Sequence, residues 1–326
     1  MKHICILVPE GDCSLTHIEA THQILSEVNV FLAGRGKPPL WTVQLVGLRK
    51  ETGIKKGLFS IYPDAVTAEI TRTDLLIIPA IQGDIGKALE ANGDFIPWMV
   101  KQYEQGASLA SMCLGSFLLA ATGLLDGRKC TTHWSAAHAF RTMFPAVELV
   151  PDKIITDDRG IYSSGGALSF QNLVVYLIEK YAGRDVAVLT AKTFMIDIDR
   201  ESQSPFIIFQ GQKEHEDDAI LRAQAFIEQN YPEKITVDEL ADRLALGRRN
   251  LERRFKKATA NSVVEYLQRV RMEAAKLSLE SGRENVMEVM FNVGYTDTKA
   301  FRTTFKKITG LSPLEYRQKY NREAMA

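Results

Sequence analysis

A cysteine and a histidine are the side chains of this sequence best suited to nucleophilic chemistry. Cys113 lies between Ser111 and Gly115 in the stretch "ASLASMCLGSFLLAATG", and His133 follows twenty residues later in "CTTHWS". A thiolate becomes a nucleophile when a neighbouring base takes its proton, and a helix that starts beside it favours the charged form. Three roles are therefore open for Cys113: a nucleophile, a residue that lines a ligand pocket, or a small apolar side chain in the core.

The elements around Cys113 predict how it is positioned. Short continuous apolar runs, as expected for strands buried on both faces, alternate with stretches of helical periodicity over about the first 200 residues. This alternation predicts an α/β fold with a mostly parallel sheet. A sharp strand-to-helix turn would place Cys113 at the carboxyl edge of that sheet, where such folds bind ligands. Strands are predicted at 3–8, 41–48, 74–80 and 107–112, and helices at 16–33, at 94–106 and from 114 onward.

The chain changes character near residue 200. We predict an N-terminal domain at 1–198, a polar linker at 199–218 and a helical domain at 219–326. Residues 221–326 carry 20 basic and 14 acidic side chains, a net charge of +6. Because the whole chain is neutral, residues 1–220 carry a net charge of −6. The asymmetry indicates different partners for the two parts, nucleic acid being one candidate for the basic part.

The helical part contains an internal repeat at an offset of 50 residues. "LERRFKKATANSVVEY" at 251–266 matches "FRTTFKKITGLSPLEY" at 301–316, and the segments upstream of the two blocks also correspond. Two matches in register predict two copies of a helix–turn–helix unit. A long helix at about 262–280 would join them.

The second helix of each unit has one apolar and one basic face. Leu251 and Phe255 define the buried stripe of the first, and Phe301 and Phe305 that of the second. Basic and amide side chains on the opposite face are those that reach bases and phosphates in a major groove, so double-stranded DNA is the predicted partner. The alternative is a solvated basic face on a helical bundle. The predicted base-reading residues are Arg249, Asn250, Arg253, Lys299, Arg302 and Thr303, and the predicted phosphate contacts are Lys256, Lys257, Lys306 and Lys307.

Residues 219–320 resemble the DNA-binding domains of the AraC/XylS class. The second unit, "VGYTDTKAFRTTFKKITGLSPLEYR", matches most closely, whereas the first unit has Asn261-Ser262-Val263 where the class often has Gly-x-Ser-Pro. The resemblance implies two recognition helices in successive major grooves, about 34 Å apart. It also implies a homodimer on a two-fold symmetric operator, with RNA polymerase as a further partner.

Residues 3–195 resemble the DJ-1/PfpI superfamily, relatives of the class I glutamine amidotransferases. The motifs are "SMCLGSFLLAATGLLDG", "TTHW" and "GIYSSGGALSFQNLVVYLIEKYAG". The resemblance implies a three-layer α/β sandwich with Cys113 and His133 at the catalytic positions. However, His17 stands about where catalytic members have an acid, and Ala-Ile-Gln-Gly at 80–83 replaces the Gly-Gly turn of their oxyanion hole. We therefore predict a non-catalytic domain whose ligand site is lined by Cys113, His133, His17 and Gln82.

The whole chain resembles GlxA-type regulators, in which a DJ-1/PfpI-like domain precedes an AraC-type domain. It is predicted to be a one-component transcriptional regulator whose N-terminal domain senses a small-molecule effector and dimerises. Two alternatives stay open: a thiol-dependent amidase or hydrolase, and a redox sensor that acts through a Cys113 sulfenate.

Composition narrows the remaining function classes. No apolar run approaches the roughly 18 to 20 residues of a membrane span. The four cysteines form no disulfide framework, so a reducing cytoplasmic setting is expected. Cys130 and His133 have no second metal-binding pair, and "GRGKPP" at 34–39 lacks the third glycine of a dinucleotide-binding loop. We predict no metal, no cofactor and no membrane partner.

Overall fold

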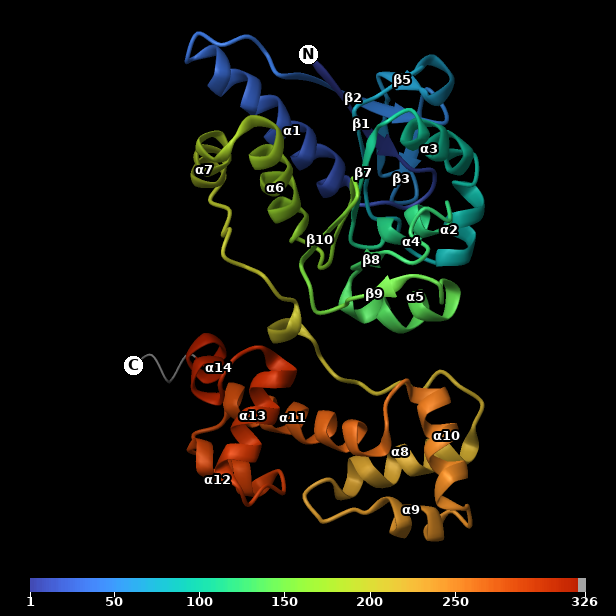
Figure 1. Ribbon diagram of the computed structural model, residues 1–326, viewed down its shortest axis with the longest axis vertical. Helices are drawn as coiled ribbons and strands as arrows, with labels where there is room; N and C mark the ends of the chain where they lie inside the picture. Colours follow the sequence, from blue (N-terminus) through green and yellow to red (C-terminus); the bar gives the residue numbers. More distant parts are fainter. Residues whose placement is uncertain (322–326) are drawn as a thin grey trace. The chain divides into compact units, whose positions relative to one another are not determined.

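The computed structural model, described for residues 1–321, divides into two compact units, Met1–Gln203 and Ser204–Ala326. The division falls inside the segment 199–218 that the sequence suggests as a linker. Figure 1 traces the chain through both units. None of the helices in the described residues is long and apolar enough to cross a membrane.

The first unit is built on a seven-stranded sheet with the strand order β10-β11-β7-β6-β1-β2-β5. All neighbouring strands pair in parallel except β10 and β11, which are antiparallel, so the predicted mostly parallel sheet is confirmed. Two small sheets, β3–β4 and β8–β9, lie outside it and were not predicted. The seven strands are β1 (Lys2–Val8), β2 (Trp41–Gly47), β5 (Ala65–Val66), β6 (Leu75–Ile78), β7 (Ser108–Met112), β10 (Ile155–Asp158) and β11 (Ile161–Ser164). The four others are β3 (Thr52–Ile54), β4 (Phe59–Ile61), β8 (Lys129–Cys130) and β9 (Glu148–Leu149).

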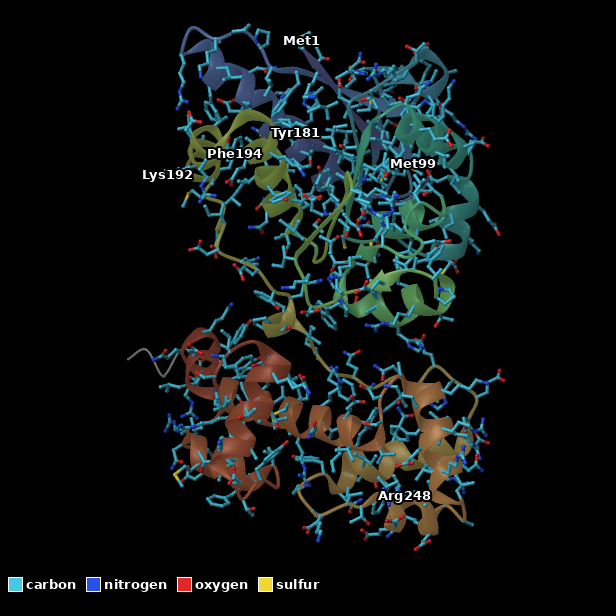
Figure 2. All side chains as sticks on the ribbon, in the orientation of Figure 1. Met1, Met99, Tyr181, Lys192, Phe194 and Arg248 are labelled. Carbon is cyan, nitrogen blue, oxygen red and sulfur yellow. The ribbon has the colours of Figure 1, made fainter. Side chains whose placement is uncertain are left out.

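Helices cover both faces of the sheet and complete a three-layer sandwich (Figure 1). One core lies between the sheet and α1, α6 and α7, and a second lies between the sheet and α2, α3, α4 and α5. Met99, on α3, is fully buried in this second core (Figure 2). The helices are α1 (Leu15–Ala33), α2 (Ile85–Ala91), α3 (Phe95–Glu104), α4 (Gly115–Ala120), α5 (Ala137–Met143), α6 (Phe170–Ala182) and α7 (Arg184–Thr193).

All regular elements of the second unit are helices in its described residues. Two cores form, one among α8, α9, α10 and the start of α11, the other among the end of α11 and α12, α13 and α14. Both predicted helix–turn–helix units are present, α9–α10 and α12–α13. The helices are α8 (Asp218–Asn230), α9 (Val237–Arg243), α10 (Arg248–Thr259), α11 (Val263–Ser281), α12 (Val286–Asn292), α13 (Thr298–Thr309) and α14 (Pro313–Tyr320).

The sequence repeat is accompanied by a repeat of helix caps and of the burial pattern. Ser262 and Ser312 cap α11 and α14, and each forms a capping box with the glutamate three residues on, Glu265 or Glu315. The substituted Asn261-Ser262-Val263 stretch therefore keeps a regular helix start. Along 251–260 and 301–310 the sequence of buried, half-buried and exposed positions is identical.

The segment 204–217, here named the strap, begins the second unit and packs against its helices. Lys276, only 3% exposed, donates to the Ile207 carbonyl at 2.6 Å and pairs with Glu273 at 2.8 Å. Glu273 in turn accepts the Phe209 amide at 3.0 Å. At the far end of the strap, Asp217 forms an ion pair with Arg254 on α10. The Pro205 carbonyl also accepts a hydrogen bond from Tyr320 on α14. The strap thus contacts both halves of the second unit, the first half being α8–α10 with the start of α11 and the second half being the end of α11 with α12–α14.

Candidate functional site

Cys113 stands on a strained turn between β7 and α4. Its φ is 54°, in the left-handed region that non-glycine residues rarely adopt. Three contacts hold this conformation. The Cys113 amide donates to the Ser164 carbonyl at 2.8 Å, and the Cys113 carbonyl accepts from the hydroxyls of Ser116 at 2.9 Å and Thr132 at 3.2 Å. The structure therefore has the geometry of a nucleophile elbow.

The helix after the elbow passes very close to the neighbouring strand. A Cβ atom on Gly115 would lie 2.4 Å from the Ile78 carbonyl oxygen and 2.5 Å from that of Pro79. Only glycine fits there, which explains the small residue two positions after Cys113.

The environment of the Cys113 thiol opposes ionisation. The side chain is 6% exposed, and burial raises the pKa of the thiol to about 11 against the opposing effect of the Leu114 amide. The start of α4 favours the thiolate through the Leu114 amide, as expected, but desolvation outweighs this effect. Burial likewise raises the pKa of Cys5 to about 11 and those of Cys13 and Cys130 to about 12.

His133 begins a short helical turn. Its Nδ1 accepts from the Ser135 amide at 3.2 Å and lies 2.8 Å from the Ser135 hydroxyl, and its ring centroid is 5.4 Å from that of Trp134. Burial lowers the pKa of the imidazole, so the neutral form is favoured. In the part of the chain that the structure describes, no hydrogen bond joins His133 to the Cys113 thiol. The two share only an indirect link through Thr132.

His17, on the first turn of α1, is 2% exposed and fully hydrogen-bonded. Its Nε2 donates to the Ala167 carbonyl at 2.8 Å, and its Nδ1 accepts from the Ala80 amide at 3.2 Å. The ring centroid lies 4.6 Å from that of Phe170. Burial lowers the pKa of this histidine, which is consistent with a neutral ring that donates from one nitrogen and accepts at the other. His17 thus ties together the loops that follow β6 and β11.

The turn after β6 is also occupied. Ala80 is the first residue of the sequence that replaces the Gly-Gly oxyanion turn, and its amide points at His17 rather than being free for a substrate oxygen. Gln82, half-buried, donates its amide to the Asp12 carbonyl at 2.8 Å, and its side-chain carbonyl accepts from Lys55. The Gln82 side chain is therefore bound to the β3–β4 hairpin.

The structure adds a residue that sequence reasoning missed. The Gln203 side chain, 2% exposed, donates from Nε2 to the carbonyls of Thr132 at 2.9 Å and Lys153 at 3.0 Å, and its Oε1 accepts from the Trp134 amide at 3.2 Å. A Cβ atom on Gly165 would lie 1.9 Å from Gln203 Nε2. The last residue of the first unit is thus anchored beside the loop that carries His133. Nothing in the polar stretch around it marks this role.

Two buried hydroxyls near the elbow are unsatisfied. Within the described residues, Ser111 on β7 and Ser164 at the end of β11 are fully buried, and neither side-chain oxygen has a hydrogen-bond partner. An orphaned polar group of this kind costs about 1–3 kcal/mol. Two hydroxyl groups near the elbow therefore have hydrogen-bonding capacity that no group in the described residues uses.

The basic face of the second unit lies on α10 and α13. Arg249, Asn250 and Arg253 are exposed and, with Gly247, line a groove of about 400 Å³. Arg253 donates to the Asn250 side chain at 3.2 Å. Arg248, at the start of α10 (Figure 2), differs because it pairs with Asp238 at 2.9 Å. The groove thus gathers the three residues that are predicted to read bases from the first helix–turn–helix unit, α9–α10.

The remaining predicted DNA contacts lie on the same faces. Lys256 is engaged locally, donating to the Ala260 carbonyl at 3.0 Å and lying 3.7 Å from Glu265. The others are exposed: Lys257 on α10, and Lys299, Arg302, Thr303, Lys306 and Lys307 on α13.

Comparisons with known proteins agree with both halves of this description. Residues 28–180 match the DJ-1/PfpI family, and residues 240–319 match a helix-turn-helix domain. The HTH-type transcriptional regulator GbdR of Pseudomonas aeruginosa is 28% identical over 88% of this chain and 77% of its own. The HTH-type transcriptional regulator GlxA of Rhizobium meliloti is 23% identical over 66% of each chain.

A solved structure supports the fold of the first unit. A putative transcriptional regulator protein from Vibrio parahaemolyticus matches with a TM-score of 0.53 and 23% identity, over 59% of this chain and 98% of that one. The predicted resemblance to GlxA-type regulators is confirmed. This chain is a transcriptional regulator in which a DJ-1/PfpI domain precedes an AraC-type helix-turn-helix DNA-binding domain.

Proposed function

We propose that the first unit binds a small-molecule effector at the elbow without chemical turnover, and that α10 and α13 of the second unit read the operator. The observation that carries the first part is the bonding of His17. The position that would hold a catalytic acid instead donates to one loop and accepts the Ala80 amide of another. In this proposal His17 therefore holds two loops of the effector site in place and takes no part in catalysis.

Three further features support binding rather than catalysis. The Cys113 thiol is protonated at neutral pH because burial raises its pKa to about 11. His133 directs its Nδ1 to Ser135. The unsatisfied hydroxyls of Ser111 and Ser164 offer hydrogen bonds to a small polar ligand. In this proposal Cys113, His133, His17 and Gln82 shape the site.

A thermal-shift screen of the full chain against a metabolite library tests this part. Wild type, Cys113→Ser and His133→Ala are run together, and each stabilising compound is assayed for consumption. A compound that stabilises both wild type and the serine variant and is recovered unchanged supports a sensor. A compound consumed by wild type and not by Cys113→Ser would instead identify a thiol amidase or hydrolase and refute the proposal.

The redox-sensor alternative is tested on the same proteins. Oxidation to a sulfenate requires an accessible thiolate, and the Cys113 thiol is buried with a raised pKa. We expect operator binding to be unchanged by peroxide. A peroxide response that Cys113→Ser abolishes would favour the redox sensor.

For the second unit, the identical burial pattern of the two helices supports DNA contact by both. We propose base contacts by Arg249, Asn250 and Arg253 in one half-site and by Lys299, Arg302 and Thr303 in the other. Lys256, Lys257, Lys306 and Lys307 contact phosphates.

Competition binding on operator and scrambled duplexes separates these roles. Arg253→Ala is expected to cost about 1–3 kcal/mol on the operator and to relax base preference. Lys307→Ala should weaken both duplexes alike and reduce the salt dependence of binding. If Arg253→Ala weakens both duplexes equally, Arg253 is a phosphate contact.

We further propose that the protein acts as a homodimer on a two-fold symmetric operator and contacts RNA polymerase. Sedimentation at micromolar concentration, with and without operator, tests the dimer. Monomer under both conditions would refute it.

A further inference from the structure

The long helix α11 belongs to two cores in turn. Its residues up to Val270 pack with α8, α9 and α10, and its residues from Met272 onward pack with α12, α13 and α14. Arg271 is the single residue between these two sets. It therefore stands where the first helix–turn–helix half passes into the second.

The Arg271 guanidinium contacts both halves. Nε donates to the Tyr231 carbonyl at 2.7 Å, and Nη2 donates to the Glu233 carbonyl at 2.8 Å. Both acceptors lie between α8 and α9, in the first half. The guanidinium carbon also lies 5.5 Å from the ring centroid of Tyr295, which belongs to the turn between α12 and α13 in the second half. One side chain thus links the loops of the two halves.

The backbones of the halves also meet at this point. A Cβ atom on Gly294, in the α12–α13 turn, would lie 2.2 Å from the Pro232 carbonyl oxygen and 3.0 Å from Arg271 Nη2. Tyr231 packs against the cores of both halves. The contact is therefore close, and Arg271 is its polar centre.

We propose that Arg271 is a positioning residue that fixes the placement of α13 relative to α10, and with it the spacing of half-sites that the protein accepts. The guanidinium is planar and permanently charged, so two carbonyl bonds and a ring contact fix its orientation, which a lysine ammonium cannot reproduce. Engaging a second half-site adds to affinity only when the geometry of the tether allows both to be held at once. The inference rests on the proposed use of both α10 and α13 on DNA.

The test uses the full chain and a duplex that wild type selects from a random pool. Derived duplexes carry one, two or three extra base pairs between the half-sites, or a scrambled second half-site. The variants are Arg271→Ala and, as a matched control, Arg269→Ala. Arg269 lies on the same helix, is also half-buried, and its guanidinium lies over the Phe209 ring of the strap, 5.8 Å from its centroid.

We expect wild type and Arg269→Ala to lose at least about tenfold in affinity when the spacing changes. Arg271→Ala should bind the selected duplex about tenfold more weakly, bind the scrambled duplex as wild type does, and depend far less on spacing. A lost structural contact alone would lower the melting temperature and leave the spacing profile unchanged.

Two results would overturn the inference. If Arg271→Ala keeps the wild-type spacing profile, Arg271 does not set the spacing. The proposal that α10 and α13 each bind a major groove, here called the two-groove proposal, would still stand. If wild type itself is indifferent to spacing, the two-groove proposal fails and the inference fails with it. Should Arg271→Ala not fold, Arg271→Lys replaces it. We expect Arg271→Lys to broaden the spacing profile, and an unchanged profile would refute the inference.

Discussion

Replacing His17 by alanine tests whether the hydrogen bonds of this residue hold the proposed effector site together. The substitution leaves the buried Ala80 amide without its acceptor at 3.2 Å, and it leaves the carbonyl of Ala167, an exposed residue, without its donor at 2.8 Å. The orphaned Ala80 amide costs about 1–3 kcal/mol, and the space left beside Phe170 adds a cavity term, whereas the Ala167 carbonyl adds little because its residue is exposed to water. We expect the free energy of unfolding of the first unit to fall by about 2–4 kcal/mol.

Tryptophan fluorescence during urea unfolding measures this change in the full chain. All three tryptophans, Trp41, Trp98 and Trp134, lie in Met1–Gln203, so the signal reports the first unit alone. His22→Ala, on the same helix, is the matched control and should change the unfolding free energy by less than about 0.5 kcal/mol. A loss below about 1 kcal/mol for His17→Ala would refute the reasoning, because the buried Ala80 amide would then have found another partner.

The pH dependence gives an independent check. Burial lowers the pKa of His17 in the folded chain, so the unfolded chain binds a proton more readily than the folded one. The stabilisation is complete above the unfolded pKa of about 6.5 and is lost as the pH falls from there towards the lowered folded value. His133 contributes with the same sign. Unfolding of wild type between pH 8 and 5 should show this loss, and His17→Ala should show a smaller one. Equal slopes would contradict a neutral, buried His17.

The remaining predictions concern backbone positions and the boundary residue. Gly310→Ala should cost about 1 kcal/mol in unfolding followed by circular dichroism, because only the left-handed backbone opposes it. Gly294→Ala should cost clearly more, because its Cβ would also strike the Pro232 carbonyl. Ala260→Gly, at the matching left-handed position of the first half, should stabilise by about 0.5–1 kcal/mol, and a loss of stability would refute strain there. Gln203→Ala should lower the tryptophan-monitored stability by about 1–3 kcal/mol, and no change would indicate that water replaces the amide.

Much of the fold was predictable because its signals are local. The strand at 107–112 and the helix at 16–33 are observed as Ser108–Met112 and Leu15–Ala33, since apolar runs and 3.6-residue periodicity are properties of short stretches. The stripe residues Phe255 and Phe305 are both fully buried, as predicted. The antiparallel edge strand β10 was missed, because its "ITDD" sequence has one buried residue and two acids.

The site was less predictable, because its contacts join distant parts of the chain. The sequence indicates a missing acid at His17, yet the bond to Ala167 spans 150 residues and no local pattern encodes it. For the same reason the elbow at Cys113 was predictable as a turn, whereas the raised pKa of its thiol depends on packing from several elements. The turn at Cys113 can be inferred from the spacing of small residues in the sequence, whereas the pKa of its thiol cannot, because that pKa depends on which side chains pack around it.

The strap, which is part of the segment predicted as a linker, packs against helices of the second unit. A polar stretch such as "GQKEHEDD" is typical of a free linker, yet here its polar groups find partners within the second unit. The His215 ring lies 3.0 Å from the Gln224 side chain, whose amide donates to the Gln212 carbonyl, and Asp217 pairs with Arg254 on α10. The polar side chains of this stretch are therefore bound by the helices that follow it in the chain, which composition alone does not reveal.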